Sequence, residues 1–196
     1  MLDELYQKCK ECSACHLRKE AATQVVPWEA GRKTEVMFIS EAPGKMEDKL
    51  GIPFRGSAGR IFDRIVQALG FERGRETHVT NVVKCRPPNN RTPTKEESRL
   101  CGSLFLDQEI EIVQPKAIIC FGRTAAGYIL NTESKSLGEL RGKVYDFKGA
   151  AVGVTFHPAY LLYNRRNEAA IKWSMWRDIT AALEEGQVKF NRKTKK

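Results

Sequence analysis

Short β-rich runs alternate along this chain with amphipathic segments, and this alternation limits the possible folds more than any other feature. Five runs have the length and composition of strands: residues 34–39 (TEVMFI), 78–83, 117–121 (AIICF), 143–147 and 151–156. Runs of this kind predict short, largely buried strands.

The segments between these runs predict helices. Residues 57–70 carry apolar side chains at three- and four-residue spacing, and Gly70 is expected near the end of that helix. Thr94 and Glu97 have the pattern of a capping box, which opens a long helix that ends before Pro115. Two more helices are expected, at residues 123–130 and 168–185.

Strands that alternate with helices indicate βαβ units, and therefore an α/β protein with a mostly parallel sheet covered on both faces. The 196 residues, 41% of them hydrophobic, are enough for one sizeable core. We expect a single domain over residues 1–186 and a basic C-terminal tail over residues 187–196. In such sheets, sites form in the loops that follow the carboxyl ends of the strands.

The charge of the chain favours a polyanionic partner. Lys and Arg outnumber Asp and Glu by 33 to 24, a formal charge of +9, and nucleic acid is the leading candidate. The tail carries five of these positive charges, on Lys189, Arg192, Lys193, Lys195 and Lys196. The rest of the chain therefore has a formal charge of +4. The chain has no apolar run of 18 residues and no apolar signal-peptide core, so we expect a cytoplasmic protein without a membrane segment.

Four of the six cysteines have the spacing of a metal site. Cys12 and Cys15 form a Cys-x-x-Cys pair, while Cys85 and Cys101 come from a distant segment. Spacing alone leaves zinc and an iron-sulfur cluster equally open, because four thiolates suit either. Cys120, inside an apolar strand, is interpreted as a packing residue, and Cys9 as a spare thiol or an alternative ligand.

Polar motifs follow three of the predicted strands. The turn at residues 41–44 (EAPG) can present backbone N–H groups to a ligand, and Phe54, in the same long loop, offers an aromatic face for stacking on a base. Asn81 offers a donor and an acceptor side by side, as an imide edge requires. His157 stands just before two leucines. Taken singly, local packing, a capped turn or a structural histidine would also explain these residues.

Together these segments resemble the family-4 uracil-DNA glycosylases, the iron-sulfur branch of that superfamily, over roughly residues 9–185. The resemblance rests on motifs that occur in the same order: Cys12-x-x-Cys15, EAPG with Glu47-Asp48, Gly51-x-Pro53-Phe54-x-Gly56-x-Ala58-Gly59, residues 81–88 (NVVKCRPP), Asn90-Arg91, Cys101 and residues 157–162 (HPAYLL). The resemblance implies a three-layer α/β/α fold of the uracil-DNA glycosylase type. The implied activity is hydrolysis of the N-glycosidic bond of uracil in DNA, the first step of base excision repair.

The resemblance also assigns ligands and site residues. It implies a 4Fe-4S cluster held by four cysteines, Cys12, Cys15, Cys85 and Cys101, with Cys9 outside the usual ligand set. Phe54 then corresponds to the residue that stacks on the extruded base, Asn81 to the one that recognises uracil, and His157 to the catalytic histidine. The substrate-binding loop includes three more residues, Ala42, Gly44 and Glu47.

The remaining roles follow from the chemistry of base release. Ala42 stands where many relatives carry a water-activating Asp, so we expect Glu41 to orient water or balance the cationic sugar, with Asn90 sharing that role. Leu161 and Leu162 are expected to fill the gap left by the extruded nucleotide. Arg86 and Arg91 are expected to meet DNA phosphates. We expect a monomer that acts on uracil-containing DNA.

Three positions depart from the family pattern. Ser40 stands where Gly is usual, Arg55 where a small apolar residue is usual, and Tyr163 where Arg is common. One alternative is therefore an iron-sulfur protein of the same fold that binds damaged or single-stranded DNA without cutting it. An electron-transfer protein is disfavoured because its ligands would be split along the chain. A relative that traps DNA covalently would need an extra His near the Arg-rich loop, where this chain has none.

Overall fold

The computed structural model describes residues 1–20, 22–30, 34–132 and 136–191, so tail residues 192–196 lie outside the described part. Within these residues the strands form one six-stranded sheet of order β1-β3-β2-β4-β6-β5. The strands are β1 (Glu29–Ala30), β2 (Val36–Ser40), β3 (Thr77–Asn81), β4 (Ala117–Phe121), β5 (Val144–Phe147) and β6 (Ala150–Thr155). The inner strands β3, β2, β4 and β6 run parallel, and the edge strands β1 and β5 pair antiparallel. The predicted mostly parallel sheet is confirmed.

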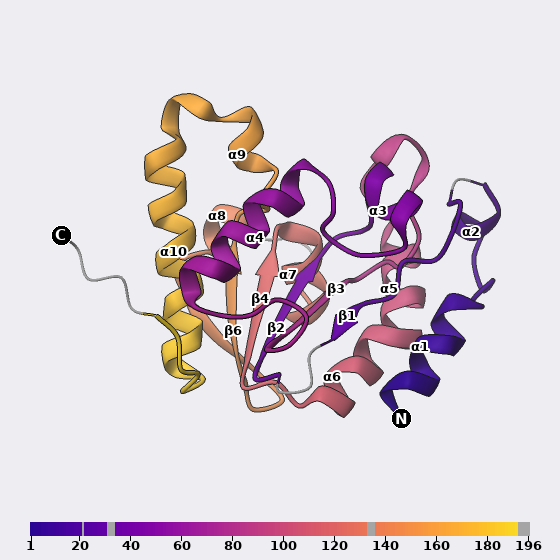
Figure 1. The fold of residues 1–196 in the computed structure, drawn as a ribbon, viewed down its shortest axis with the longest axis horizontal. Helices are drawn as coiled ribbons and strands as arrows, with labels where there is room; N and C mark the ends of the chain where they lie inside the picture. Colours follow the sequence, from indigo (N-terminus) through magenta and orange to yellow (C-terminus); the bar gives the residue numbers. More distant parts are fainter. Residues whose placement is uncertain (21, 31–33, 133–135, 192–196) are drawn as a thin grey trace.

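Helices flank the sheet on both sides (Figure 1). The α-helices are α1 (Leu2–Lys10), α2 (Leu17–Glu20), α3 (Lys45–Leu50), α4 (Ser57–Leu69), α5 (Lys95–Cys101), α6 (Asp107–Val113), α7 (Arg123–Ile129), α8 (Leu137–Leu140), α9 (Tyr160–Tyr163) and α10 (Glu168–Glu185). Short 3₁₀ turns are η1 (Pro88–Asn90) and η3 (Arg165–Asn167), and a π-helical turn is η2 (Gly102–Leu106).

Successive residues of the central strands point to opposite faces of the sheet, because side chains alternate along a strand. They therefore contribute to two separate hydrophobic cores. Phe38 and Phe121 face α4 and α10, where they pack with Phe62, Met175 and other apolar side chains. Ile39 and Ile118 face the opposite side and pack with residues of α1, α6 and α7. Both faces of the sheet are therefore covered, and the three-layer α/β/α architecture is confirmed.

The long helix predicted after Thr94 is interrupted by a π-helical turn. Its capping box forms as expected, because Thr94 Oγ1 accepts from Glu97 N at 3.2 Å and the Glu97 carboxylate accepts from Thr94 N at 2.6 Å. Helix α5 then passes through η2 into α6. Gly102 lets the ring of Tyr128 approach, since a Cβ there would lie 2.2 Å from that ring. The π turn directly follows Cys101, a position typical of functional sites.

Several short elements were not predicted from the sequence. Residues 45–50, expected as loop, form α3, which ends at Gly51 with a φ of 72°. Helix α1 and the two-residue strand β1 were also missed. The first part of the expected tail is packed on the body: Val188 is buried, and Asn191 N donates to Leu69 O at 2.8 Å. No helix in the described part of the chain is long and apolar enough to cross a bilayer.

The contact of α10 with the sheet depends on Gly153 of β6. A Cβ at this position would lie 2.8 Å from Ala182 Cβ and 2.9 Å from the backbone oxygen of Asp178. We expect Gly153→Ala to lower the free energy of unfolding by about 1–3 kcal/mol, because the helix must shift away from the sheet. Urea denaturation measures this value. Gly138→Ala in α8, where the nearest atom is 3.9 Å away, is the matched control, and equal stability of the two variants would contradict the prediction.

Candidate active site

A cleft of about 530 Å³ opens at the carboxyl edge of the sheet. It is bordered by the segments that follow β2, β3, β4 and β6, as expected for a parallel α/β sheet. Most of the predicted site residues line it: Glu41, Ala42, Gly44, Glu47, Phe54, Asn81, Asn90, Arg91 and His157. Three others, Arg86, Leu161 and Leu162, are not among its lining residues.

Ser40 and Asn81 lie side by side at the inner end of the cleft. They are partners in the parallel register of β2 and β3, so their side chains leave the same face of the sheet. Asn81 is 3% exposed and Ser40 is 1% exposed. Among the described residues, the Ser40 hydroxyl has no hydrogen-bond partner. The departure from Gly therefore adds a buried polar group directly beside the predicted recognition amide.

Phe54 is held in a strained backbone conformation with its ring against the cleft. Its φ of 52° lies in the left-handed region, which a bulky side chain adopts only when its surroundings enforce it. The ring stacks on Phe62 at 4.5 Å and lies 5.9 Å from the ring of His157 at an interplanar angle of 17°. Gly59 permits this arrangement, because a Cβ there would lie 2.1 Å from the Phe54 carbonyl oxygen.

Arg73 fixes the backbone around Phe54 and was missed by the sequence reasoning. Its guanidinium donates to Phe54 O at 3.0 Å and to Pro53 O at 2.6 Å. Glu29 accepts from the same guanidinium at 2.8 Å and 3.1 Å, and Asp63 pairs with it as well. No local motif marks Arg73 in the sequence, since all of its partners lie ten or more residues away.

Glu47 organises the turn that directly follows Phe54. One carboxylate oxygen accepts from the backbone N–H groups of Arg55 and Gly56, both at 2.7 Å. Gly44 is needed here, because a Cβ at that position would lie 2.8 Å from Glu47 Oε2. The EAPG turn and the PFRG turn are thus joined through one carboxylate.

His157 is a neutral hydrogen-bond donor at neutral pH. Burial lowers the pKa of His157 from 6.5 to about 4, and the nearby Glu47 carboxylate offsets only part of this effect. Nδ1 accepts from Ala159 N at 3.0 Å. Because Nδ1 is an acceptor, the single ring proton must lie on Nε2.

The predicted polar residues at the cleft have protein partners. Thr124, at the start of α7, donates from its hydroxyl to Glu41. Asn90 Oδ1 accepts from Arg86 Nε at 2.7 Å. Arg91 forms two hydrogen bonds to the Glu97 carboxylate, at 2.8 Å and 2.6 Å. Arg91 is therefore held along the cleft wall.

The expectation that Leu161 and Leu162 fill the gap left by the extruded nucleotide does not fit the burial of Leu161. This side chain is 5% exposed and packs in the core shared with Phe54 and Ile171. Leu162 is partly buried against the same core, whereas Tyr163 is 84% exposed. Leu161 points inward because α9 follows the strand end in one short turn, and the apolar side of that turn faces the core.

The four predicted ligand cysteines meet at a second, small cavity. Cys12, Cys15, Cys85 and Cys101 all line it, together with apolar side chains such as Val25, Val83, Leu104 and Phe105. Cys9 and Cys120 are fully buried and do not line it. Among the described residues, no three His, Cys, Asp or Glu side chains converge closely enough to hold one metal ion.

The cysteine segments are also joined by protein contacts. His16, next to Cys15, contacts the Glu97 carboxylate at 2.9 Å. Burial raises the pKa of Cys85 to about 12 and that of Cys101 to about 11. Without a metal these groups remain protonated thiols at neutral pH, so binding of a metal releases protons.

A buried ionic network lies between the cleft and the cysteine cavity. Lys84 Nζ donates to Thr80 Oγ1 at 2.6 Å and to Asn81 O at 2.7 Å, and it pairs with Glu109. Glu109 also contacts His78 Nε2 at 2.9 Å. Burial alone would raise the pKa of Glu109, but Lys84 and His78 bring it below its usual value. The backbone N of Lys84 donates to Cys101 Sγ at 3.3 Å.

Comparison with known proteins indicates the uracil DNA glycosylase superfamily. Residues 27–180 match the family model of the uracil DNA glycosylase superfamily. The chain is 41% identical over 169 residues to a type-4 uracil-DNA glycosylase of Thermotoga maritima, covering 86% of each chain. It is 39% identical over 169 residues to one of Archaeoglobus fulgidus, covering 83% of each. It is 37% identical over 196 residues to one of Pyrobaculum aerophilum, covering 96% of each.

The protonation state of His157 can be measured directly. We expect long-range ¹H–¹⁵N NMR to show His157 titrating near pH 4, below the usual 6.5, because burial penalises the imidazolium. At pH 7 the spectrum should show the Nε2–H tautomer. A titration near pH 6.5 would contradict the effect of burial on the pKa of His157, and a proton on Nδ1 would contradict the role of Ala159 N–H as the donor.

Proposed function

The chain belongs to the uracil DNA glycosylase superfamily, and we propose that it removes uracil from DNA by hydrolysing the N-glycosidic bond, which initiates base excision repair. The observation that carries this proposal is the cleft in which an aromatic ring, a buried amide and a neutral imidazole face one space. These three groups are what binding, selection and release of one flat base require. A cytoplasmic location and a monomeric state are part of the proposal.

We assign recognition of the base to Phe54 and Asn81. The ring of Phe54 stacks on the extruded base. The Asn81 amide accepts from uracil N3–H and donates to O4, whereas cytosine presents the opposite pattern at both positions. Because Asn81 is 3% exposed, a mismatched base would leave a buried amide unpaired. This is the source of selectivity against cytosine.

His157 acts as the donor to the leaving base. Cleavage of the glycosidic bond places negative charge on uracil O2, and the Nε2–H of neutral His157 stabilises that charge. A neutral donor suits this task, because the His157 ring carries no charge until negative charge develops on the base. Backbone N–H groups of the turn at Ala42 and Gly44 support the same oxygen.

Glu41 and Asn90 are assigned to the sugar side of the reaction. Ala42 has no side-chain base, so the Glu41 carboxylate orients water or balances the positive charge that develops on the sugar. Its contact with the Thr124 hydroxyl fixes its direction. Arg86, Arg91 and Leu162 are assigned to DNA contact. Leu161 is left out of this role because it is buried in the core.

We further propose that Cys12, Cys15, Cys85 and Cys101 hold a 4Fe-4S cluster. Four thiolates suit either zinc or an iron-sulfur cluster, and the resemblance to the iron-sulfur branch of the glycosylases favours the cluster. In a four-iron cluster each thiolate binds a different iron, which suits four thiols spread around one apolar cavity. When bound, the cluster supplies structural cross-linking of the N-terminal segment to the loop of residues 85–101.

The cofactor assignment predicts the metal content of the protein. Protein purified without oxygen should be brown and contain about four iron atoms per chain. Cys12→Ser and Cys101→Ser should lose iron, while Cys9→Ala, outside the cavity, should retain it. Colourless protein with stoichiometric zinc, or full iron in both serine variants, would refute the assignment.

The proposed activity is tested by excision of uracil from a DNA oligonucleotide under single-turnover conditions. The account expects release of free uracil and an abasic product. A protein that binds the oligonucleotide tightly but releases no uracil would instead be the non-cutting DNA-binding protein.

Asn81 provides the sharper test of the base-binding arrangement. Asn81→Ala should slow uracil excision by about 30-fold to 1,000-fold, because it removes a paired amide worth about 2–4 kcal/mol in a dry pocket. Asn81→Asp, of nearly equal size, cannot donate to O4 while ionised, so activity on cytosine should rise relative to uracil. Affinity for undamaged DNA should stay unchanged. Near wild-type excision by Asn81→Ala, or equal loss of binding to all DNA, would contradict the assignment.

A further inference from the structure

A short helix at the mouth of the cleft carries exposed side chains that have no role in the chemistry above. Helix α3 directly follows the EAPG turn, and Lys45 and Met46 at its start line the cleft. Its sequence, KMEDKL, combines two acidic, two basic and two apolar residues. How these six side chains are distributed decides which ligand the helix can bind.

Both acidic residues of α3 are turned inward and used. Asp48 is 3% exposed, and its carboxylate accepts from Thr23 N at 2.9 Å and Gln24 N at 3.3 Å. Glu47 accepts from the backbone of Arg55 and Gly56. The helix is therefore anchored on two sides, and its carboxylates are withdrawn from the outer face.

The outer face of α3 is cationic and apolar only. Lys45 and Lys49 are exposed and stand four residues apart, so they lie one above the other on the helix. Met46 and Leu50 have the same spacing and are 44% and 49% exposed. We call this face, made of Lys45, Met46, Lys49 and Leu50, the mouth ridge. It combines a row of positive charge with a row of exposed apolar surface beside the cleft.

We propose that the mouth ridge binds the uracil-bearing DNA strand beside the extruded nucleotide; this inference rests on the proposed function. Lys45 and Lys49 contact phosphates. Met46 and Leu50 pack against the sugar and the base surface that extrusion uncovers, which is the role of apolar wedges in other DNA-bending proteins.

Two observations support DNA as the occupant. The ridge is continuous with the cleft through Lys45 and Met46, so it lies within reach of a strand that places one base in the cleft. Its charge is also complementary to phosphate, with both carboxylates of the helix engaged elsewhere. Of the two wedge residues expected from the sequence, Leu161 is buried and Leu162 is partly buried, whereas Met46 and Leu50 are exposed and can add to the apolar contact.

The test distinguishes the lysine row of the ridge from its apolar row by the salt dependence of DNA affinity. The probe is DNA that contains 2′-fluoro-2′-deoxyuridine, whose glycosidic bond resists cleavage, and affinity is measured by fluorescence anisotropy across a salt series. Lys45→Ala/Lys49→Ala should reduce the slope of log affinity against log salt by about 1.4 to 1.8, the value for two phosphate contacts. Met46→Ala/Leu50→Ala should leave the slope unchanged but weaken binding by about 5-fold to 30-fold.

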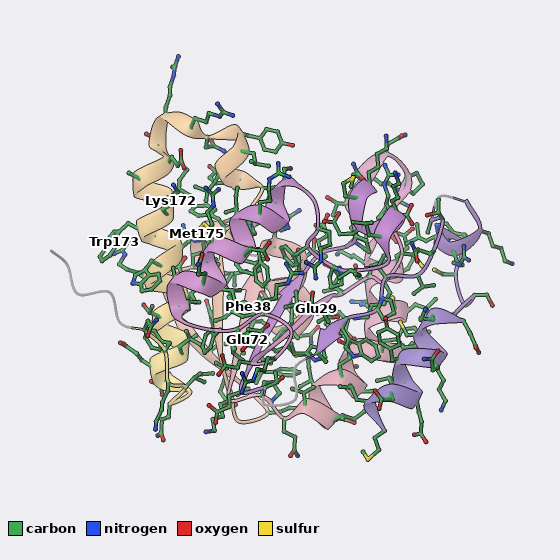
Figure 2. All side chains as sticks on the ribbon, in the orientation of Figure 1. Glu29, Phe38, Glu72, Lys172, Trp173 and Met175 are labelled. Carbon is green, nitrogen blue, oxygen red and sulfur yellow. The ribbon has the colours of Figure 1, made fainter. Side chains whose placement is uncertain are left out.

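The matched control is Lys172→Ala/Trp173→Ala, an exposed lysine and an exposed apolar residue of α10; Trp173 lies on the side of this helix away from the sheet (Figure 2). It should bind as the wild type does. If both ridge variants keep wild-type affinity and slope while the wild type excises uracil, the ridge inference fails and the proposed function stands. If the control weakens binding as much as the ridge variants, the inference fails as well. A wild-type protein that excises no uracil would instead refute the proposed function.

Discussion

The cleft and the cysteine cavity both depend on the contacts made by the buried ammonium group of Lys84. Lys84 is 1% exposed and binds Thr80, the carbonyl of Asn81 and the carboxylate of Glu109, while its own backbone N–H reaches Cys101. The same residue thus fixes the end of the strand that carries Asn81, the proposed recognition amide, and one wall of the cysteine cavity. Loss of Lys84 alone would leave the buried Glu109 carboxylate with His78 as its remaining partner, a cost of about 3–5 kcal/mol. The network therefore couples the integrity of the cysteine segment to the position of Asn81.

The cleft is arranged before any ligand arrives. Phe54 is held at a positive φ, which costs about 1–3 kcal/mol, and Arg73 opposes that strain by binding two carbonyl groups in the same turn. Glu47 holds the turn that follows Phe54 by accepting from the backbone N–H groups of Arg55 and Gly56. His157 is kept neutral by burial and oriented by a backbone N–H. Donors and rings that need no rearrangement stabilise developing charge most effectively.

The parts of the structure that the sequence predicted are those with local signals. The strand at residues 117–121 and the Thr94 capping box follow from a few neighbouring residues, and both are confirmed. The site was found through motifs at strand ends, because parallel strands bring those ends to one edge. Arg73 and the Lys84–Glu109 pair were missed because their partners are distant in sequence. Leu161 was misjudged for a similar reason: exposure depends on how α9 packs, and the spacing of apolar residues does not reveal this.

The central claim is that one base lies between Phe54, Asn81 and His157, with its N3–O4 edge toward the amide and O2 toward the imidazole. A crystal structure of the protein with abasic DNA and free uracil tests it most directly. The account predicts a uracil ring stacked on Phe54, hydrogen bonds from Asn81 to N3–H and O4, and Nε2 of His157 within hydrogen-bond distance of O2. A uracil ring bound outside this cleft, or turned so that O4 faces His157, would contradict it.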